Sequence, residues 1–370
     1  LLQPQVHGAA GGRAHVLGVG AEASLNKIFW SEMDVRIHEM APTDQIAALT
    51  STQINALDTA DLAGMGTAQV AALRSDQLQG MSTAQVNVLT TTQVAALDDA
   101  QLGSLTTAQV ANLKTDAIAT LSSSQVPGLK AEQLEALSTT QISKLTTSQI
   151  AAIQASVLAT LATENMASLS TAQVASLNTQ QVAALTSDQV AALGTQQLNS
   201  FTAAGIKAIE VQDWVAIDPT KVSALATSQI ASLTSDQWQS MTTNQMAALT
   251  TQQLQSALSA SMVAVLSVDQ LAQIDSDHIA VLAADQLGAI DPSALATLTN
   301  TQLDGLSSAQ LAVLSTNQVN ALTTAQLQVF NTAQMAALTS AQLGGMSTEQ
   351  LASIKSNLIV AIAANALAGL

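Results

Sequence analysis

The sequence is dominated by an eight-residue repeat that runs from Ala41 almost to the C-terminus. Successive units read LTTTQVAA, LDDAQLGS and LTTAQVAN over residues 89–112. Units begin at every eighth residue from 41 to 249, one extra residue enters at 256–257, and units resume from 258 to 354, which makes 40 units. The first position is nearly always Leu, Ile, Met or Phe, the fifth is Gln in 29 units, and the sixth is usually apolar. A short period held this long indicates small structural elements that pack on their neighbours.

Each unit carries the features of a helix start. In the unit LTSDQWQS, Thr234 at the second position is suited to cap the helix, and Gln237 three residues later completes a capping box. Leu233 and Trp238 then occupy the two positions of a hydrophobic staple. Because the next cap comes eight residues later, we predict one helix of about five to seven residues per repeat.

Two further features support this register. Asp218-Pro219 and Asp291-Pro292 place proline at the first helical position, where its missing N–H costs nothing. Acidic residues gather at the fourth position, as Asp76 and Asp236 do, where a carboxylate meets the positive end of the helix dipole. Neither pattern is expected of strands.

We therefore predict an all-α solenoid built from very short helices. Helices of six residues do not persist alone in water, so each must stack on its neighbours. A single long helix is excluded because eight residues overshoot two turns and no apolar stripe would survive. The alternative is a β-solenoid, since Thr and Val favour strands and glutamines can form ladders. Against that alternative, the apolar spacings of five and three would point side chains to opposite faces of a strand.

The presence and phase of the octad repeat divide the chain into three parts. Residues 1–40 contain no repeat and form a predicted N-terminal arm or cap, residues 41–257 form a repeat solenoid, and residues 258–370 continue it after the one-residue phase shift. We expect Pro127 to end its short helix early. The repeat is most degraded over residues 201–224, where a kink or thickened joint is expected. The alternative there is an irregular binding site formed by Asp213, Trp214 and Lys221.

Composition excludes several classes of function. The net charge of −16 opposes binding to nucleic acid. The chain has no Cys, its four His are scattered, and it contains no catalytic or nucleotide-binding motif, so we predict no enzymatic activity, cofactor or metal centre. Whether the acidic rows bind calcium is left open. No apolar run reaches the ~18 residues of a membrane span.

The two ends suggest surfaces for assembly. The chain begins with Leu1 rather than Met, so we expect a processed form or a fragment. A solenoid needs polar terminal caps, yet the last residues are apolar. The predicted self-assembly contacts are Val16, Leu17, Val19, Phe29, Trp30, Leu358, Ile359, Ile362, Leu367 and Leu370.

The octad L-[ST]-T-x-Q-[VIL]-x-x resembles repeat tracts of large bacterial secreted or surface proteins, including adhesin-like and filament-associated ones. The resemblance covers residues 41 to about 362 and implies an extracellular or cell-surface location. We hypothesise a structural role as a stalk, spacer or filament subunit that assembles head to tail. The alternatives are an adhesin or binding module that presents its surface to a cell-surface protein or glycan, and an ice- or surface-binding protein that uses rows of Thr.

Overall fold

The computed structural model describes residues 42–362 and Ala366. Within these residues it contains 39 α-helices, one 3-10 helix and no strand. The prediction of an all-α solenoid with one short helix per repeat is confirmed, and the β-solenoid is wrong for this part of the chain. A helical turn brings both apolar positions of a unit inward, which a strand cannot do because their spacing is odd.

The helices are short and evenly spaced along the chain. The first group comprises α3 (Thr43–Ala48), α4 (Ser51–Asn55), α5 (Thr59–Gly64), α6 (Thr67–Ala71), α7 (Ser75–Gln79), α8 (Thr83–Val88), α9 (Thr91–Ala95), α10 (Asp99–Ser104), α11 (Thr107–Ala111), α12 (Thr115–Ala119), η1 (Val126–Gly128), α13 (Ala131–Glu135) and α14 (Thr139–Lys144). The second comprises α15 (Thr147–Ala152), α16 (Ala155–Leu158), α17 (Thr163–Ala167), α18 (Thr171–Ala175), α19 (Thr179–Ala183), α20 (Ser187–Ala192), α21 (Thr195–Ser200), α22 (Ala203–Ala208), α23 (Val211–Trp214), α24 (Pro219–Ser223), α25 (Thr227–Ile230), α26 (Ser235–Ser240) and α27 (Thr243–Ala248). The third comprises α28 (Thr251–Ala257), α29 (Ala260–Val263), α30 (Val268–Leu271), α31 (Ser276–Ala280), α32 (Ala284–Gly288), α33 (Pro292–Leu295), α34 (Asn300–Asp304), α35 (Ser308–Val313), α36 (Thr316–Ala321), α37 (Thr324–Leu327), α38 (Thr332–Ala336), α39 (Ser340–Gly344), α40 (Thr348–Ser353) and α41 (Ser356–Ile359).

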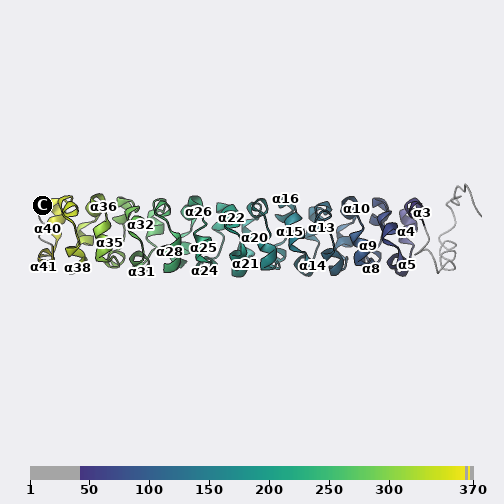
Figure 1. Ribbon diagram of the computed structural model, residues 1–370, viewed down its shortest axis with the longest axis horizontal. Helices are drawn as coiled ribbons and strands as arrows, with labels where there is room; N and C mark the ends of the chain where they lie inside the picture. The colour runs from purple at the N-terminus through teal and green to yellow at the C-terminus, as the bar shows by residue number, and fades with distance from the viewer. Residues whose placement is uncertain (1–41, 363–365, 367–370) are drawn as a thin grey trace, which may run out of the picture.

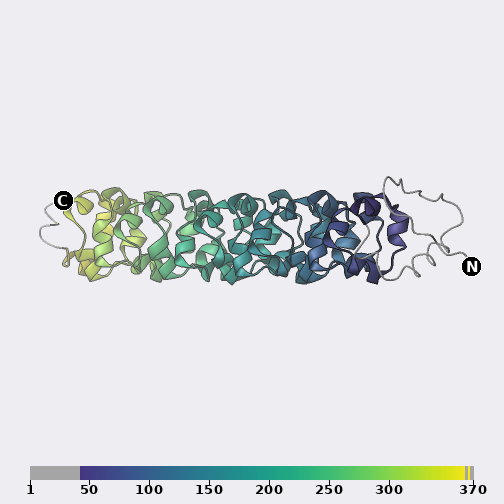
Figure 2. The same cartoon turned by 45° about the vertical axis from the view of Figure 1, so that its right-hand side comes forward.

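The helices coil into a straight rod. Figure 1 shows them progressing from α3 at one end to α41 at the other, without any reversal of direction. The outline stays long and narrow when the rod is turned by 45° (Figure 2). The chain therefore builds a one-dimensional stack in which each segment contacts only its neighbours.

A typical unit, residues 105–112, has the predicted anatomy. Leu105 and Thr106 are extended, and α11 begins at Thr107. The Thr106 side chain accepts the N–H of Gln109, and the Gln109 side chain accepts the N–H of Thr106, which is the capping box expected from the sequence. Proline starts α24 and α33 as predicted, with Asp218 and Asp291 as their N-caps.

The core lies along the axis of the rod. The first and sixth positions are buried in almost every unit, as in Leu105 and Val110, and they form one hydrophobic cluster along the described length. Their burial stabilises the fold by about 1.5–3 kcal/mol per side chain. Since the helices are too short to persist alone, this shared core is what makes them stable.

The structure departs from the predicted pattern in three places. Several helices, such as α16 and α23, have only four residues, one fewer than the shortest predicted. Pro127 lacks an N–H, and its unit forms only the 3-10 helix η1. The extra residue at 256–257 is absorbed by the seven-residue α28, whose end is closed by Leu258 N–H bonding to Leu254 O, four residues back.

Hydrogen bonds between successive turns join residues about 25 to 31 apart, for example Asn87 with Asn112 and Gln109 with Leu78, so one turn takes about 28 residues. Most helices pack on the helix three repeats earlier, as α7 does on α4 and α21 on α18. The side chain of fifth-position Gln109, for example, bonds to the carbonyl of first-position Met81 in the preceding turn. With eight residues per repeat, one turn holds three and a half repeats, so units seven repeats apart lie above each other on the rod.

Candidate functional site

The recurrent polar site of this fold is the fifth-position glutamine, which is buried between two turns. In Gln109, the side-chain Oε1 accepts the N–H of Thr106 at 2.7 Å, and the backbone N–H donates to Thr106 Oγ1 at 3.2 Å. Its Nε2 donates to the carbonyls of Leu78 at 2.8 Å and Met81 at 2.7 Å, 31 and 28 residues earlier. One side chain therefore closes the start of its own helix and the end of a helix in the preceding turn.

The same cross-turn bond is made by every fifth-position glutamine from Gln77 to Gln350. We call this row the glutamine ladder. The ladder matters because a buried carboxamide without partners would cost about 1–3 kcal/mol. Here both the oxygen and the amino group have partners, so burial is compatible with stability.

The ladder also replaces missing caps. Gly66 and Lys130 stand at the second position and offer no side-chain acceptor. Their backbone N–H groups still donate to Gln69 and Gln133 Oε1, each at 2.7 Å. The glutamine half of the capping box therefore persists in units that lack a Ser or Thr cap.

No backbone hydrogen bond joins one turn to the next within the described residues. Every backbone–backbone bond there links residues three or four apart, inside one unit or between a unit and the first residue of the next. The turns are held together by the apolar core, the ladder and a few other side chains. This separates the fold from a β-solenoid, in which backbone ladders carry that load.

The ladder is interrupted where another residue replaces glutamine. Lys221 keeps the bond, because its Nζ donates to the carbonyls of Ala191 at 2.6 Å and Leu193 at 2.9 Å. Asn165 keeps a longer one, from Nδ2 to Leu137 O at 3.3 Å. Beyond Gln77, the other replacements donate no side-chain hydrogen bond to the preceding turn; they are Ala117, Val157, Gly205, Asp213, Met262, His278, Ala294 and Leu358.

The structure places the three residues of the predicted irregular site in the wall and core of the rod. Trp214 is fully buried at a sixth position, and its Nε1 has no hydrogen-bond partner. Asp213 is 3% exposed and accepts the hydroxyl of Ser187 at 2.6 Å. Lys221 is bound to the preceding turn, as described above. Trp214 thus lies in the core, Asp213 and Lys221 are bonded to the preceding turn, and Figure 1 shows no bend at α22–α24, in contrast to the expected kink.

Three of the predicted assembly residues lie in the described C-terminal unit. Leu358 and Ile362 are buried in the core, whereas Ile359 is 46% exposed beside Val360, which is 85% exposed. The other seven, Val16, Leu17, Val19, Phe29, Trp30, Leu367 and Leu370, lie outside the described residues. Of the residues predicted for assembly that the structure describes, only Ile359 offers apolar surface.

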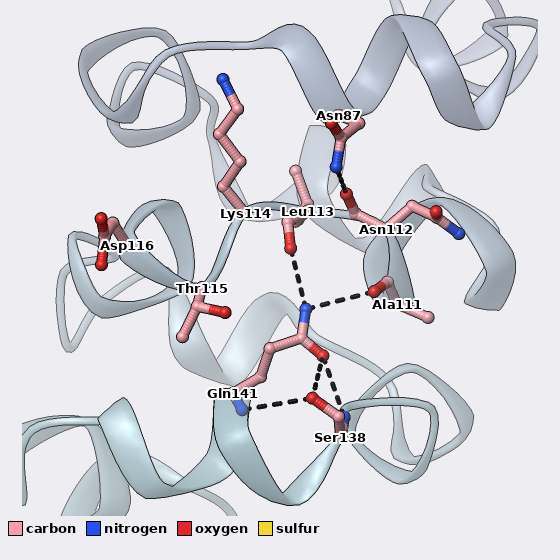
Figure 3. A pocket seen from close by; sticks show the side chains of 9 residues that line it. All are labelled: Asn87, Ala111, Asn112, Leu113, Lys114, Thr115, Asp116, Ser138 and Gln141. Carbon is pink, nitrogen blue, oxygen red and sulfur yellow. Dashed lines mark hydrogen bonds between the residues drawn. The ribbon is translucent and has the colours of Figure 1, made fainter.

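A polar depression of about 520 Å³ lies where α11 passes into α12. Figure 3 shows its side chains coming from three successive turns, with Asn87 above and Ser138 and Gln141 below. Asn87 Nδ2 donates to Asn112 O at 2.7 Å, and Gln141 Nε2 donates to Leu113 O at 2.9 Å. Much of its polar lining is thus engaged in holding the turns together.

Charged groups lie mainly at helix starts. The hydrogen bond from the Arg74 guanidinium, 2.9 Å from Asp76, lowers the pKa of that carboxyl. The Thr220 hydroxyl and N–H lower the pKa of Asp218, and the Ser293 hydroxyl and N–H lower that of Asp291. His278 Nδ1 lies 2.9 Å from Asp275 Oδ1 without forming a hydrogen bond to it, and the same oxygen accepts the backbone N–H of His278.

Two searches of the described residues bear on partners. No group of three or more His, Asp or Glu is arranged to hold a metal ion in the region of the chain that the structure describes. None of the described helices has the length and apolar character needed to cross a membrane.

The cross-turn role of the fifth-position glutamine was not predicted, although the sequence carries a signal for it. A capping box accepts Glu as well as Gln. None of the 40 units has Glu at the fifth position, whereas one has Lys. Glutamine and lysine share N–H donors that glutamate lacks. The preference for Gln over Glu is thus consistent with a favoured side-chain donor, and positions such as Asp213 show that the donor is not obligatory.

The comparison with protein families agrees with this anatomy. The profile of the ALTTAQ repeat matches residues 54–91, 83–115, 94–131, 158–195, 214–251, 287–324 and 321–362, which together cover well over half of the chain. The chain belongs to the ALTTAQ repeat family. The six letters occur literally at residues 321–326 and run from the small eighth position, through the core Leu322 and the cap Thr323, to the ladder residue Gln326. The ALTTAQ hexad is thus the segment that starts a helix and ties it to the turn before. A comparison with curated proteins gives no match.

Proposed function

We propose that this ALTTAQ repeat protein is a structural spacer, an extended acidic rod that serves as a stalk or as a subunit of an extracellular filament. The observation that carries the proposal is the glutamine ladder, which repeats one mechanical connection from Gln77 to Gln350. Residue types that elsewhere support catalysis or ligand binding are used here for caps and rungs. We accordingly propose a non-enzymatic role.

Small-angle X-ray scattering of the full chain tests the proposed rod. At 28 residues per turn, residues 42–362 make about eleven turns, and with helices packed ~9 Å apart the rod is roughly 100 Å long. We expect a radius of gyration of about 30 Å, whereas a compact globule of 370 residues would give about 20 Å. A value as small as that of the globule would contradict the proposal.

Head-to-tail assembly is the finer aspect of the proposal. A heterologous contact between rods that does not close would generate a filament. In the described C-terminal unit, Ile359 and Val360 provide exposed apolar surface for such a contact. The location outside the cell follows from the resemblance to surface and filament proteins and is proposed on that basis.

Electron microscopy over a range of concentrations tests the assembly. We expect end-to-end strings that disappear in Ile359→Asp, because a charge would enter the contact. Thr348→Asp, on an exposed position of α40, is the matched control and should assemble normally. Single rods at every concentration, with no difference between the two variants, would rule out self-assembly through this end.

A further inference from the structure

The continuity of the glutamine ladder varies along the rod. From Gln302 to Gln350 every unit has its glutamine, and each one bonds to the preceding turn. From 262 to 294, by contrast, Met262, His278 and Ala294 alternate with Gln270 and Gln286. This stretch, residues 258–298, directly follows the extra residue in α28. We call it the interrupted segment, and residues 299–353 the continuous segment.

Nothing of comparable strength replaces the missing rungs in the interrupted segment. Met262 Sδ receives only a long contact from the Ser235 hydroxyl, at 3.7 Å, and sulfur is a weak acceptor. His278 Nδ1 is buried without a hydrogen-bond partner. Ala294 has no polar side-chain atom. Three of the helices here, α29, α30 and α33, are only four residues long.

The other long interruption, at Gly205 and Asp213, is better supported. Asp213 accepts the Ser187 hydroxyl from the preceding turn, and Lys221 completes the next rung. Asn199 adds two further cross-turn bonds, donating to Ala224 O at 3.0 Å and accepting the Ala226 N–H at 2.7 Å. Trp214 also enlarges the core there. Of these two interruptions, the interrupted segment therefore has the weaker cohesion between turns.

We propose that the rod is an extensible spacer whose turns separate singly and in sequence under axial tension, beginning in the interrupted segment. This rests on the proposed role as a structural rod. Since no backbone hydrogen bond crosses between described turns, separating a turn breaks only side-chain contacts and leaves the covalent chain to carry the load. Helices this short cannot persist once their turn has separated. Each separated turn thus releases 28 residues, about 90–100 Å of chain.

Hydrogen exchange of the unloaded full chain tests the order of opening. We expect amides of α29–α33 to exchange about tenfold faster than those of α35–α40, because local opening reports the cohesion of each unit. Equal exchange in the two segments would overturn the proposal.

Two substitutions of opposite sense and similar side-chain size test whether the ladder causes the difference in exchange rate between the two segments. Met262→Gln supplies a donor within reach of Ile230 O and Leu233 O, by analogy with Gln270, which bonds to the same positions one unit later. Gln318→Met removes a rung bonded to Leu287 O and Ile290 O. We expect the first to slow exchange in the interrupted segment and the second to accelerate it around α32–α36, each by about tenfold. Asn317→Met, one residue away on the exposed face, is the control and should change neither.

Optical-tweezers measurements on the full chain then test extension itself. The chain has no Cys, so Thr59→Cys and Thr348→Cys provide unique attachment points at exposed positions. We expect stepwise lengthening, with the first steps at higher force in Met262→Gln and at lower force in Gln318→Met. A single all-or-none event, or forces that neither substitution changes, would overturn the proposal. The scattering experiment above tests the rod shape independently of tension. The proposal of extension can therefore fail while the proposed structural rod is retained.

Discussion

Each ladder glutamine both caps the start of its own helix and donates hydrogen bonds to the preceding turn, two roles that are usually filled by different residues. Its oxygen completes the capping box within one unit, and its amino group closes the carbonyl end of another unit 28–31 residues earlier. Glutamate could do only the first job, because it lacks a donor. This explains why Gln rather than Glu is the usual residue at the fifth position, where Lys221 also supplies a donor.

Replacing one rung measures its value. Gln245→Met keeps the size of a fully buried side chain but leaves the Thr242 N–H and the carbonyls of Trp214 and Ile217 without their partner. We expect a loss of about 2–3 kcal/mol in the free energy of unfolding, measured by urea denaturation. Gln239→Met, on an exposed seventh position, should stay within about 0.5 kcal/mol of the parent. Equal effects of the two would show that the buried bonds contribute nothing.

The capping aspartates make a separate prediction about pH. The Thr220 hydroxyl, 2.5 Å from Asp218, is the main cause of the lowered pKa of that carboxyl. A pKa that is lower in the folded state stabilises the fold above the usual aspartate pKa of ~3.9, and this contribution is lost as pH falls through the folded value. We expect Thr220→Val to move the Asp218 pKa back toward its usual value in an NMR titration. An unchanged titration would contradict the assigned cause.

The residue pattern predicted the start of each helix but not its cross-turn partners. Thr106 and Gln109 lie three residues apart, and local geometry alone determines how they meet. The bond from Gln109 to Met81 spans 28 residues. Its partner is determined by the combined path of several bends around the axis, and the sequence of one unit does not specify that path. The burial of Trp214 follows from its sixth position, whereas the bond of Asp213 to Ser187 depends on the preceding turn and was not predicted.

The helices of this rod are too short to be stable in isolation. Each has four to seven residues, and each depends on the neighbours that cover its first and sixth positions. The close approach of successive helices also restricts the eighth position to small residues at many units. A methyl group built on Gly305 would lie only 2.6 Å from the Ser276 carbonyl oxygen in the preceding turn.

Two glycine substitutions test this packing of elements. Gly305→Ala must push two turns apart, and we expect a loss of about 1–3 kcal/mol in the free energy of unfolding. Gly288→Ala is the matched control, because a methyl group there would have no neighbour within 4 Å. It should stabilise its helix by about 0.5–1 kcal/mol, since alanine loses less backbone entropy than glycine. Thermal unfolding of both variants decides the point, and a neutral Gly305→Ala would show that the turns are looser than described.

At the scale of the whole molecule, the rod is a coil in which each turn holds three and a half repeats. Its length follows from the number of repeats, and its cohesion follows from the core and the ladder. The sequence predicted the solenoid and the short helices, since both depend on the octad alone. The octad pattern also predicts a local bulge at 256–257, but α28 instead absorbs the extra residue as one more helical residue.

Distances between spin labels on the rod test the coil most directly. Thr83, Thr139, Thr195 and Thr251 all occupy third positions, each seven repeats or two turns after the last, and the chain has no Cys to interfere with labelling through Cys substitutions. From Thr83, we expect distances to the other three sites of about 20, 40 and 60 Å, in equal steps along the axis. A continuous helix would instead give steps of about 84 Å, and a globular arrangement would give no steady increase. Either result would contradict a solenoid of stacked eight-residue units.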